Sequence, residues 1–554
     1  METTRRPHIH SLAHRGVIQG VTVASGTPTR PGTDLCHYFG GVRYALAPLQ
    51  RWRRAHPLPA TFSYGTKDAP GRCDGGAALC PQPAFLDLSP LNPDAWNEDC
   101  FQCNVYVPTG PVPEGGWPVY FYIHGGWLQF GTPNSFHAEA LLGETDFNCV
   151  IVMPAYRVNL FGFLYSSELA QDAASVGETV GNQGFWDQRL ALEWTKENVH
   201  LFGGNPENIT ISGYSAGANS AFHQVAFDLR QPDDKAIIRQ ACILSNGPAV
   251  QPKSPAETQT QFNQLVSALE IPLSLSAGEK IARLRSIPAA RLLDVAKEIE
   301  VHQFRPATDT DFIVPSLFES LDNGEFARKL LSRNLRLILG ECRDERHLYG
   351  TWFPPKTDTL SGLRTRLIAD YPERIVDALI PLRYPGGRLP PDCTNWAVDA
   401  WGKIYADMQV YQMQRGLIHA LTSNSAGIDA SRLIHRYRIE FRAKCVDGSM
   451  PPEWGVTHSS DYPIWFWGNG NVLTDQEKKI VREAFIAPLS RFVKGAQAAT
   501  GPDGFGWGAS GKTVRALTAD GRVEIREHDP LWDEAIRVWK RLKEVRGDAE
   551  RSKL

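Results

Sequence analysis

The chain has 554 residues, of which 42% are hydrophobic and 21% charged, the composition of an ordinary globular protein. Its net charge of −3 comes without a long run of one sign, which argues against the basic surface that nucleic-acid binding requires. No apolar stretch approaches the length of a membrane span, and ten cysteines are too few for a disulfide scaffold.

The N-terminal stretch METTRRPHIHSLAHRG carries basic residues but no apolar segment behind them, so it does not predict a secretory signal. Farther along, short apolar and β-branched runs predict buried strands at residues 119–123, 150–153, 209–211, 242–244 and 335–339. Between the second and third runs, apolar residues recur at near-helical spacing and predict a helix. Strands that alternate with helices indicate an α/β protein with a mostly parallel sheet covered on both faces.

The pattern turns helical from residue 254 to about 299. Strand-like runs resume after it, so we expect a helical insertion over the sheet, at about 254–330, rather than an independent domain. Residues 385–391, PGGRLPP, predict a loop, and residues 434–441 alternate as in a late strand near the far edge. Cys100 and Cys103 form a C-x-x-C pair without a second pair or suitably spaced histidines, and we predict no metal site.

A serine lies between two glycines directly after the predicted strand at 209–211. Residues 213–217, GYSAG, fit the pattern G-x-S-x-G, in which glycines let the backbone turn tightly and leave the serine exposed at the tip. The helix predicted at 218–227 would aim backbone N–H groups at this serine. The strand, turn and helix together predict that Ser215 is a nucleophile.

A second glycine motif follows the strand at 119–123. The stretch YIHGGW places Gly125 and Gly126 directly after that strand. Their N–H groups, with that of Ala216, are candidates for stabilising a developing oxyanion. Together with Ser215 they favour an acyl-transfer site over a plain glycine turn.

A serine nucleophile needs a histidine base, and in such folds the chain order is Ser, then Asp or Glu, then His. Seven histidines follow Ser215. His458 lies in WGVTHSSDYP, a polar loop from which an imidazole can reach across a sheet. His223 belongs to the helix after the elbow, and His419 and His435 lie in periodic segments, so these three are interpreted as structural.

The orienting acid is less sharply defined by the residues themselves. The stretch LRLILGECRDERH places Glu341, Asp344 and Glu345 after a strand end, where open α/β sheets carry their site residues. All three remain candidates at this point.

These landmarks resemble the type-B carboxylesterase/lipase family of the α/β-hydrolase superfamily, which includes the cholinesterases. The matching segments are FGGVRYALAP, EDCFQCNVYVP, YIHGGW, YRVNLFGFL, HSSDYPIWFWG and, most specifically, the block at residues 181–218. The resemblance covers roughly residues 15–545. It implies one large α/β-hydrolase domain for residues 1–554, with helical insertions.

The resemblance also implies a catalytic triad of Ser215, Glu345 and His458, with Gly125, Gly126 and Ala216 as the oxyanion hole. Two departures stand out: Arg346 follows Glu345 where the family usually has glycine, and Asp461 stands where a glutamate is usual. Because of the first departure, the two neighbouring carboxylates stay open as alternatives for the acid.

The family's structural ion pairs imply that Arg157 pairs with Asp187 and that Arg53 pairs with Glu98. These charges are not interpreted as catalytic. The family also joins the cysteines equivalent to Cys80 and Cys100, so we expect the two to lie close together. Whether they are bonded is left open, because an intracellular chain tends to keep its thiols.

The implied activity is hydrolysis of a small-molecule carboxylic ester through an acyl-enzyme, without a cofactor. Lactone, lactam or amide hydrolysis on the same triad is the alternative. A non-catalytic scaffold is disfavoured because the three triad residues are all present.

The chain ends in Ser552-Lys553-Leu554 after a charged helical tail. A terminal S-K-L is read by the peroxisomal import receptor and is not a membrane anchor. We therefore expect peroxisomal residence, with the cytoplasm as the alternative.

Overall fold

The computed structural model describes residues 2–26, 31–84, 93–495, 507 and 510–551. The targeting tripeptide expected at 552–554 lies outside these residues. The strands are β1 (Thr3–Ser11), β2 (Val17–Ser25), β3 (Asp34–Arg43), β4 (Ala45–Leu46), β5 (His56–Pro57), β6 (Gly71–Arg72), β7 (Gln102–Val107), β8 (Trp117–Ile123), β9 (Val150–Pro154), β10 (Gly204–Tyr214), β11 (Ile238–Leu244), β12 (Arg336–Cys342), β13 (Ile434–Ile439), β14 (Val514–Leu517) and β15 (Val523–Arg526).

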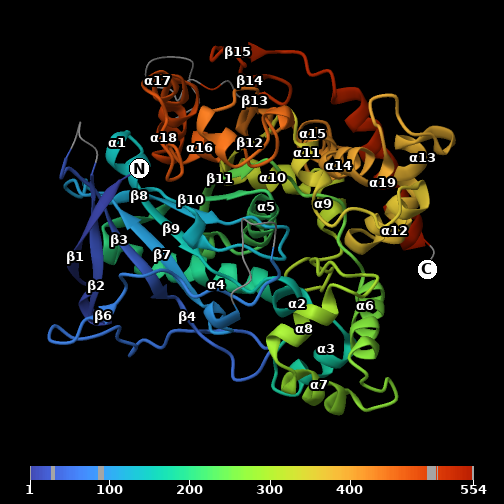
Figure 1. Cartoon of the computed structure of the whole chain (residues 1–554), viewed down its shortest axis with the longest axis horizontal. Helices are drawn as coiled ribbons and strands as arrows, with labels where there is room; N and C mark the ends of the chain where they lie inside the picture. Colours follow the sequence, from blue (N-terminus) through green and yellow to red (C-terminus); the bar gives the residue numbers. More distant parts are fainter. Residues whose placement is uncertain (1, 27–30, 85–92, 496–506, 508–509, 552–554) are drawn as a thin grey trace.

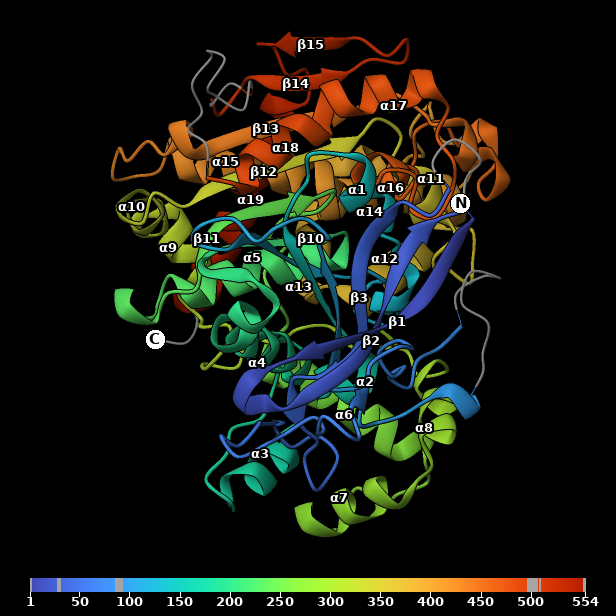
Figure 2. The ribbon, with the colours of Figure 1, turned by 90° about the vertical axis from the view of Figure 1, so that its left-hand side faces the viewer.

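Within the described residues a 13-stranded sheet dominates the molecule (Figure 1). Its strands run in the order β1-β2-β3-β7-β9-β8-β10-β11-β12-β13-β14-β15, with β6 beside β2. Pairing is parallel from β9 to β14 and antiparallel toward both edges, except that the short β6 pairs in parallel with β2. Figure 2 faces the antiparallel strands β1–β3. The carboxyl ends of the parallel strands share one edge, where such sheets place their sites.

The sheet separates two hydrophobic cores because successive strand residues point to opposite faces. In β8, Val119, Phe121 and Ile123 enter one core, whereas Tyr120 and Tyr122 enter the other. The first core includes apolar residues of the helices α4 (Gln183–Asn198), α5 (Ala216–Asp228), α15 (Gln412–Thr422) and α19 (Trp532–Arg551). The second includes those of α1 (Glu139–Glu144), α17 (Asp475–Val481) and α18 (Ala487–Val493). Helices therefore cover both faces of a mostly parallel sheet, as predicted.

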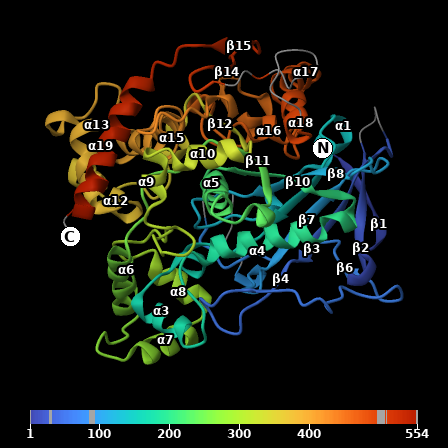
Figure 3. The same cartoon turned by 180° about the vertical axis from the view of Figure 1, so that it is seen from behind.

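The α-helices are α1 (Glu139–Glu144), α2 (Asn159–Phe163), α3 (Ser167–Ala174), α4 (Gln183–Asn198), α5 (Ala216–Asp228), α6 (Pro255–Ala268), α7 (Ala277–Ser286), α8 (Ala289–Ala296), α9 (Leu317–Asp322), α10 (Glu325–Ser332), α11 (Arg346–Gly350), α12 (Leu360–Asp370), α13 (Glu373–Arg383), α14 (Trp401–Ala406), α15 (Gln412–Thr422), α16 (Tyr462–Trp465), α17 (Asp475–Val481), α18 (Ala487–Val493) and α19 (Trp532–Arg551). Helix α4 is the helix predicted between β9 and β10, and seen from behind it lies across the strands (Figure 3). Reciprocal side-chain and backbone hydrogen bonds begin α6 at Ser254 and Glu257, and α7 at Ser276 and Glu279.

The helical stretch after residue 254 forms α6, α7 and α8, which lie beside α2 and α3 at one corner of the molecule (Figure 1). The predicted loop at 385–391 begins with a single 3₁₀ turn, Pro385–Gly387. Among the described residues, no helix combines the length and apolarity needed to cross a membrane.

Candidate active site

Ser215 occupies a tight turn between β10 and α5. Its backbone has φ 57° and ψ −125°, a region that few residues other than glycine adopt and that costs about 1–3 kcal/mol. Its N–H donates to the carbonyl of Leu244 at the end of the neighbouring strand β11, at 2.9 Å. The strained turn thus lies at the carboxyl edge of the parallel strands.

The two flanking glycines are required by close backbone contacts. A Cβ atom on Gly213 would overlap the carbonyl of Gly217, and a Cβ on Gly217 would overlap the carbonyl of Ile123 at the end of β8. Side chains at these positions would therefore force apart the strand, the turn and the helix. This crowding explains physically why the sequence reads G-x-S-x-G.

Glu345 and His458 meet across 113 residues of sequence. Glu345 follows β12, and its Oε2 lies 2.5 Å from Nδ1 of His458. Its Oε1 accepts the N–H of Cys342 at 2.8 Å, and both side chains are buried. The carboxylate is fixed by backbone at one oxygen and faces the imidazole with the other, which is the arrangement that orients a general base.

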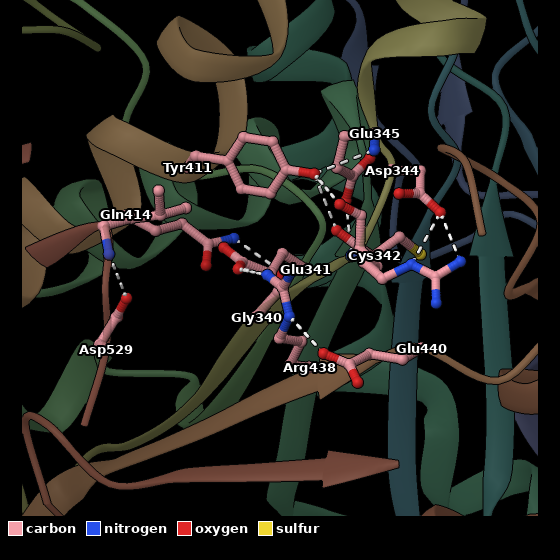
Figure 4. A network of polar contacts seen from close by, with 12 residues as sticks. Gly340, Glu341, Cys342, Asp344, Glu345, Tyr411, Gln414, Arg438, Glu440 and Asp529 are labelled. Atoms are coloured by element: carbon pink, nitrogen blue, oxygen red, sulfur yellow. Dashed lines mark hydrogen bonds and ion pairs between the residues drawn. The ribbon is translucent and has the colours of Figure 1, made fainter. Parts of the chain in front are cut away.

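The two other candidate acids have different partners (Figure 4). Glu341 is buried in ion pairs with Arg415 and Arg438. Asp344 accepts the N–H of Val456 at 2.9 Å and pairs with Arg343. Neither contacts His458, so the structure brings only Glu345 to the imidazole.

Ser215 and His458 line one cavity of about 330 Å³. Gly125, Gly126 and Trp127 form part of its wall. Among the described lining residues, none is Asp, Glu, Lys or Arg. The imidazole of His124 also lines it, and burial lowers the pKa of that residue to about 4, so it stays neutral.

The predicted oxyanion-hole residues lie around the nucleophile. A Cβ atom on Gly125 would come 3.1 Å from Cβ of Ser215. The backbone of Gly125 thus lies so close to the serine that any larger residue would be crowded there. Gly126 has φ +106°, which also favours glycine. Ala216 is the first residue of α5, where backbone N–H groups have no partner within the helix.

Two residues beside the site were not predicted as a pair from the sequence. The hydroxyl of Tyr214, directly before the nucleophile, donates to Oδ1 of Asp461 at 2.6 Å and accepts the N–H of Ser459 at 2.8 Å. The indole of Trp465 donates to the other carboxylate oxygen of Asp461 at 2.8 Å. This network ties the turn carrying Ser215 to the loop carrying His458.

A third unpredicted residue contacts the imidazole itself. Tyr349, in α11, places its hydroxyl oxygen 3.3 Å from Nε2 of His458. No motif marks this tyrosine. It lies four residues after Glu345, about one helical turn, so both residues face the same side of the chain. This spacing is the signal that could have indicated Tyr349 from the sequence.

The remaining histidine interpretations agree with the structure. His223 lies within α5, packed on Phe185, and burial lowers its pKa to about 3. His419 lies near the end of α15 and His435 within β13. None of these three lines the cavity of Ser215.

One of the two predicted ion pairs forms and the other was wrong. Arg157 and Asp187 make a buried two-pronged pair, with N–O distances of 2.7 and 2.8 Å. Arg53 instead pairs with Asp172, and Glu98 pairs with Arg51. Trp52, between the two arginines, has φ 65°, and this turn sends their side chains to different partners.

The expected proximity of Cys80 and Cys100 is confirmed. Their Cα atoms lie 5.4 Å apart, and a disulfide joins them. Cys103 of the C-x-x-C pair is a buried free thiol in β7. Over the residues that the structure describes, no group of three or more His, Cys, Asp or Glu is placed to hold a metal ion.

A serine hydroxyl, an imidazole and a buried carboxylate around one cavity can perform nucleophilic acyl transfer.

A family model described as the carboxylesterase family matches residues 8–503. The chain is 42% identical over 547 residues to a carboxylic ester hydrolase of Gibberella moniliformis, covering 97% of this chain and 96% of that protein. It is 36% identical over 556 residues to an uncharacterized esterase/lipase of Schizosaccharomyces pombe, covering 98% of each.

The fold also resembles the crystal structure of Aspergillus niger EstA, with a TM-score of 0.71 and 20% identity over 97% of this chain and 99% of that one. The molecule is an α/β-hydrolase. The chain belongs to the carboxylesterase family and is a carboxylic ester hydrolase.

Proposed function

We propose that this protein cleaves uncharged carboxylic esters through an acyl-enzyme formed on Ser215. The observation that carries the proposal is the 2.5 Å contact between Glu345 and His458 beside a serine held in a strained strand-to-helix turn. A carboxyl oxygen facing Nδ1 of His458 favours the tautomer in which Nδ1 carries the hydrogen, and Nε2 is left as the base.

In the proposed reaction, Ser215 attacks the ester carbonyl as His458 takes up the serine proton. The N–H groups of Gly125, Gly126 and Ala216 stabilise the resulting oxyanion. The imidazolium then protonates the leaving alcohol, and water repeats the sequence to release the acid. The chemistry is complete with these side chains and requires no cofactor.

The cavity supports an uncharged substrate. Its described lining offers neither a carboxylate for a cationic group nor a lysine or arginine for an anionic one, and Trp127, Phe130 and Phe136 supply apolar surface. Transferring a charged group into such a cavity unpaired is unfavourable. A panel of esters that differ only in a terminal ammonium, carboxylate or methyl group tests this selectivity.

The nucleophile is tested by Ser215→Ala. We expect turnover and covalent labelling by an organophosphorus probe to disappear, while the thermal unfolding midpoint shows that the protein remains folded. Ser220→Ala, which removes another buried hydroxyl one turn farther along α5, is the matched control. Labelling that persists without Ser215 contradicts the proposal. Lactones and lactams in the substrate panel separate ester from ring-opening activity.

We further propose peroxisomal import through residues 552–554. The support is the sequence Ser-Lys-Leu alone. A fluorescent protein fused to the N-terminus, with and without the tripeptide, tests the proposal: a diffuse signal from the intact chain contradicts it.

A further inference from the structure

A tyrosine from a distant helix holds the turn that carries the proposed acid (Figure 4). The hydroxyl of Tyr411 accepts the backbone N–H of Glu345 at 3.0 Å. It donates its own proton to the carbonyl of Arg343 at 2.7 Å, and the carbonyl of Cys342 lies 3.0 Å away as a second acceptor. One phenol oxygen therefore ties together the backbone of the turn between β12 and α11.

The acid depends on this turn because its backbone and its carboxylate are both fixed there. Oε1 of Glu345 accepts the N–H of Cys342 at 2.8 Å, while Oε2 faces Nδ1 of His458 at 2.5 Å. Glu345 is also the residue at which α11 begins, and an N–H at the start of a helix has no acceptor within that helix. The Tyr411 oxygen supplies the acceptor at a buried residue, where an unpaired donor is unfavourable.

The tyrosine itself is placed by an irregular stretch of helix. Tyr411 ends a π-helical turn, Asp407–Tyr411, which lies between α14 and α15. Such turns are rare and frequently occur at functional sites. Arg415, one turn farther along, donates to the Tyr411 carbonyl at 2.8 Å and forms a two-pronged ion pair with Glu341 at 2.7 and 2.9 Å. The helix is thereby bound to the end of β12 at a second point.

The hydroxyl of Tyr411 keeps its proton. Burial is the main cause that raises the pKa of Tyr411 well above its ordinary value, and the charges of Glu345 and Glu341 raise it further. A protonated phenol donates one hydrogen bond and still accepts another. Tyr411 can therefore hold the Glu345 N–H and a carbonyl of the turn at the same time.

We propose that Tyr411 is a positioning residue, whose hydroxyl keeps the carboxylate of Glu345 directed at His458. Tyr411 is not among the described residues that line the cavity of Ser215, so it acts through Glu345 and not on the substrate. Without the hydroxyl the turn loses the hydrogen bonds that fix the acid, and a misplacement of about 1 Å can cost about 10²-fold in rate. This inference rests on the proposed function.

Tyr411→Phe tests the proposal, since it removes the hydroxyl and keeps the ring. We expect kcat/KM for p-nitrophenyl acetate to fall by about 10–100-fold, mainly through kcat. Titration with an organophosphorus probe counts the reactive serines in each sample, so that the rate refers to folded sites only.

Tyr384→Phe is the matched control. Its buried hydroxyl also donates to a backbone carbonyl, that of Ala400 at 2.9 Å, but Tyr384 is neither in contact with the turn of the acid nor among the described residues that line the cavity. We expect its kcat/KM to stay within about threefold of the wild type.

A double-mutant cycle with Glu345→Gln separates positioning from a purely structural role. If Tyr411 acts through the carboxylate, adding Tyr411→Phe to Glu345→Gln should lower kcat/KM by less than about threefold more. A tyrosine that only stabilises the fold would cost the same factor in both backgrounds, and that result overturns the proposal.

A Tyr411→Phe enzyme that keeps the wild-type kcat/KM also overturns it. Ser215→Ala and Glu345→Gln, measured in the same assay, distinguish this failure from failure of the proposed function. If either of these two variants keeps the wild-type rate, the proposed function fails. If both are impaired while Tyr411→Phe is not, only the positioning role fails.

Discussion

The three carboxylates at the end of β12, Glu341, Asp344 and Glu345, differ in their partners more than in their position. Glu345 faces His458, whereas Asp344 holds the backbone of Val456 and Glu341 is enclosed by arginines. We expect Glu345→Gln, which keeps the shape and removes the charge, to lower kcat/KM by about 10³–10⁴-fold.

Asp344→Asn is the matched control for this variant. It should stay within about tenfold of the wild-type kcat/KM, because its contact with Val456 only supports the loop. Steady-state kinetics on one activated ester compares the two variants. A larger loss for Asp344→Asn than for Glu345→Gln would mean that the acid has been misassigned.

Asp461 links stability to pH. Burial is the main cause that raises its pKa from 3.8 to about 6. Between these values the folded state holds a proton that the unfolded state has lost, so unfolding releases a proton and rising pH weakens the fold. This contribution to stability is present below about pH 4 and is lost as the pH rises through about 6.

Asp461→Asn should remove that loss. An amide nitrogen cannot accept the Trp465 indole hydrogen bond, so the variant is less stable overall, and the pH slope is the informative quantity. Between pH 4 and pH 7 the free energy of unfolding of the variant should rise relative to that of the wild type by on the order of 1–3 kcal/mol. Urea unfolding at several pH values measures the difference. Parallel curves for the two proteins would contradict the prediction.

The turn between β10 and α5 depends on its glycines as an element. Gly213→Ala should lower the free energy of unfolding by about 2–3 kcal/mol and reduce activity, because its Cβ would overlap backbone that is fixed on both sides. Gly278→Ala in the exposed α7 helix is the control. Nothing lies within 4 Å of its added Cβ, so a gain of up to about 1 kcal/mol is expected. Thermal unfolding compares them, and equal effects would contradict the crowding argument.

The elements predictable from the sequence were the buried parallel strands. β8–β12 lie inside the sheet and are covered on both faces, so each shows as a continuous apolar run. The edge strands β1 and β15 are exposed or half-buried along their whole length, and β1 is mostly polar. Their mixed patterns resemble loops and did not reveal them.

Within the site, a motif marked some residues and not others. Gly213 and Gly217 were predictable because the turn itself forces their identities, and Ser215 because it lies between them in the G-x-S-x-G pattern. The residues alone left Glu341 and Asp344 open beside Glu345, and only the family resemblance singled out Glu345. Tyr349 lies about one helical turn from Glu345, but its contact with His458 joins distant parts of the chain, as does the contact of Tyr214 with Asp461, and local spacing does not reveal such contacts.

At the scale of the whole molecule, the Cys80–Cys100 disulfide leaves eight free cysteines. We therefore expect eight reactive thiols in denatured protein without reductant and ten after reduction. Titration with a chromogenic disulfide reagent measures both numbers. Ten thiols before reduction would show that the bridge is absent in the isolated protein.

The contact between Tyr214 and Asp461 joins residues 247 positions apart. A ribosome adding about 5–20 residues per second needs roughly 12–50 s to make that stretch. Throughout this interval the nascent polypeptide carries Ser215 without the proposed base, His458, and without the Asp461 carboxylate that accepts the hydrogen bond of Tyr214. If Ser215 and His458 act as proposed, we therefore expect ester hydrolysis to begin only when synthesis of the chain is almost finished.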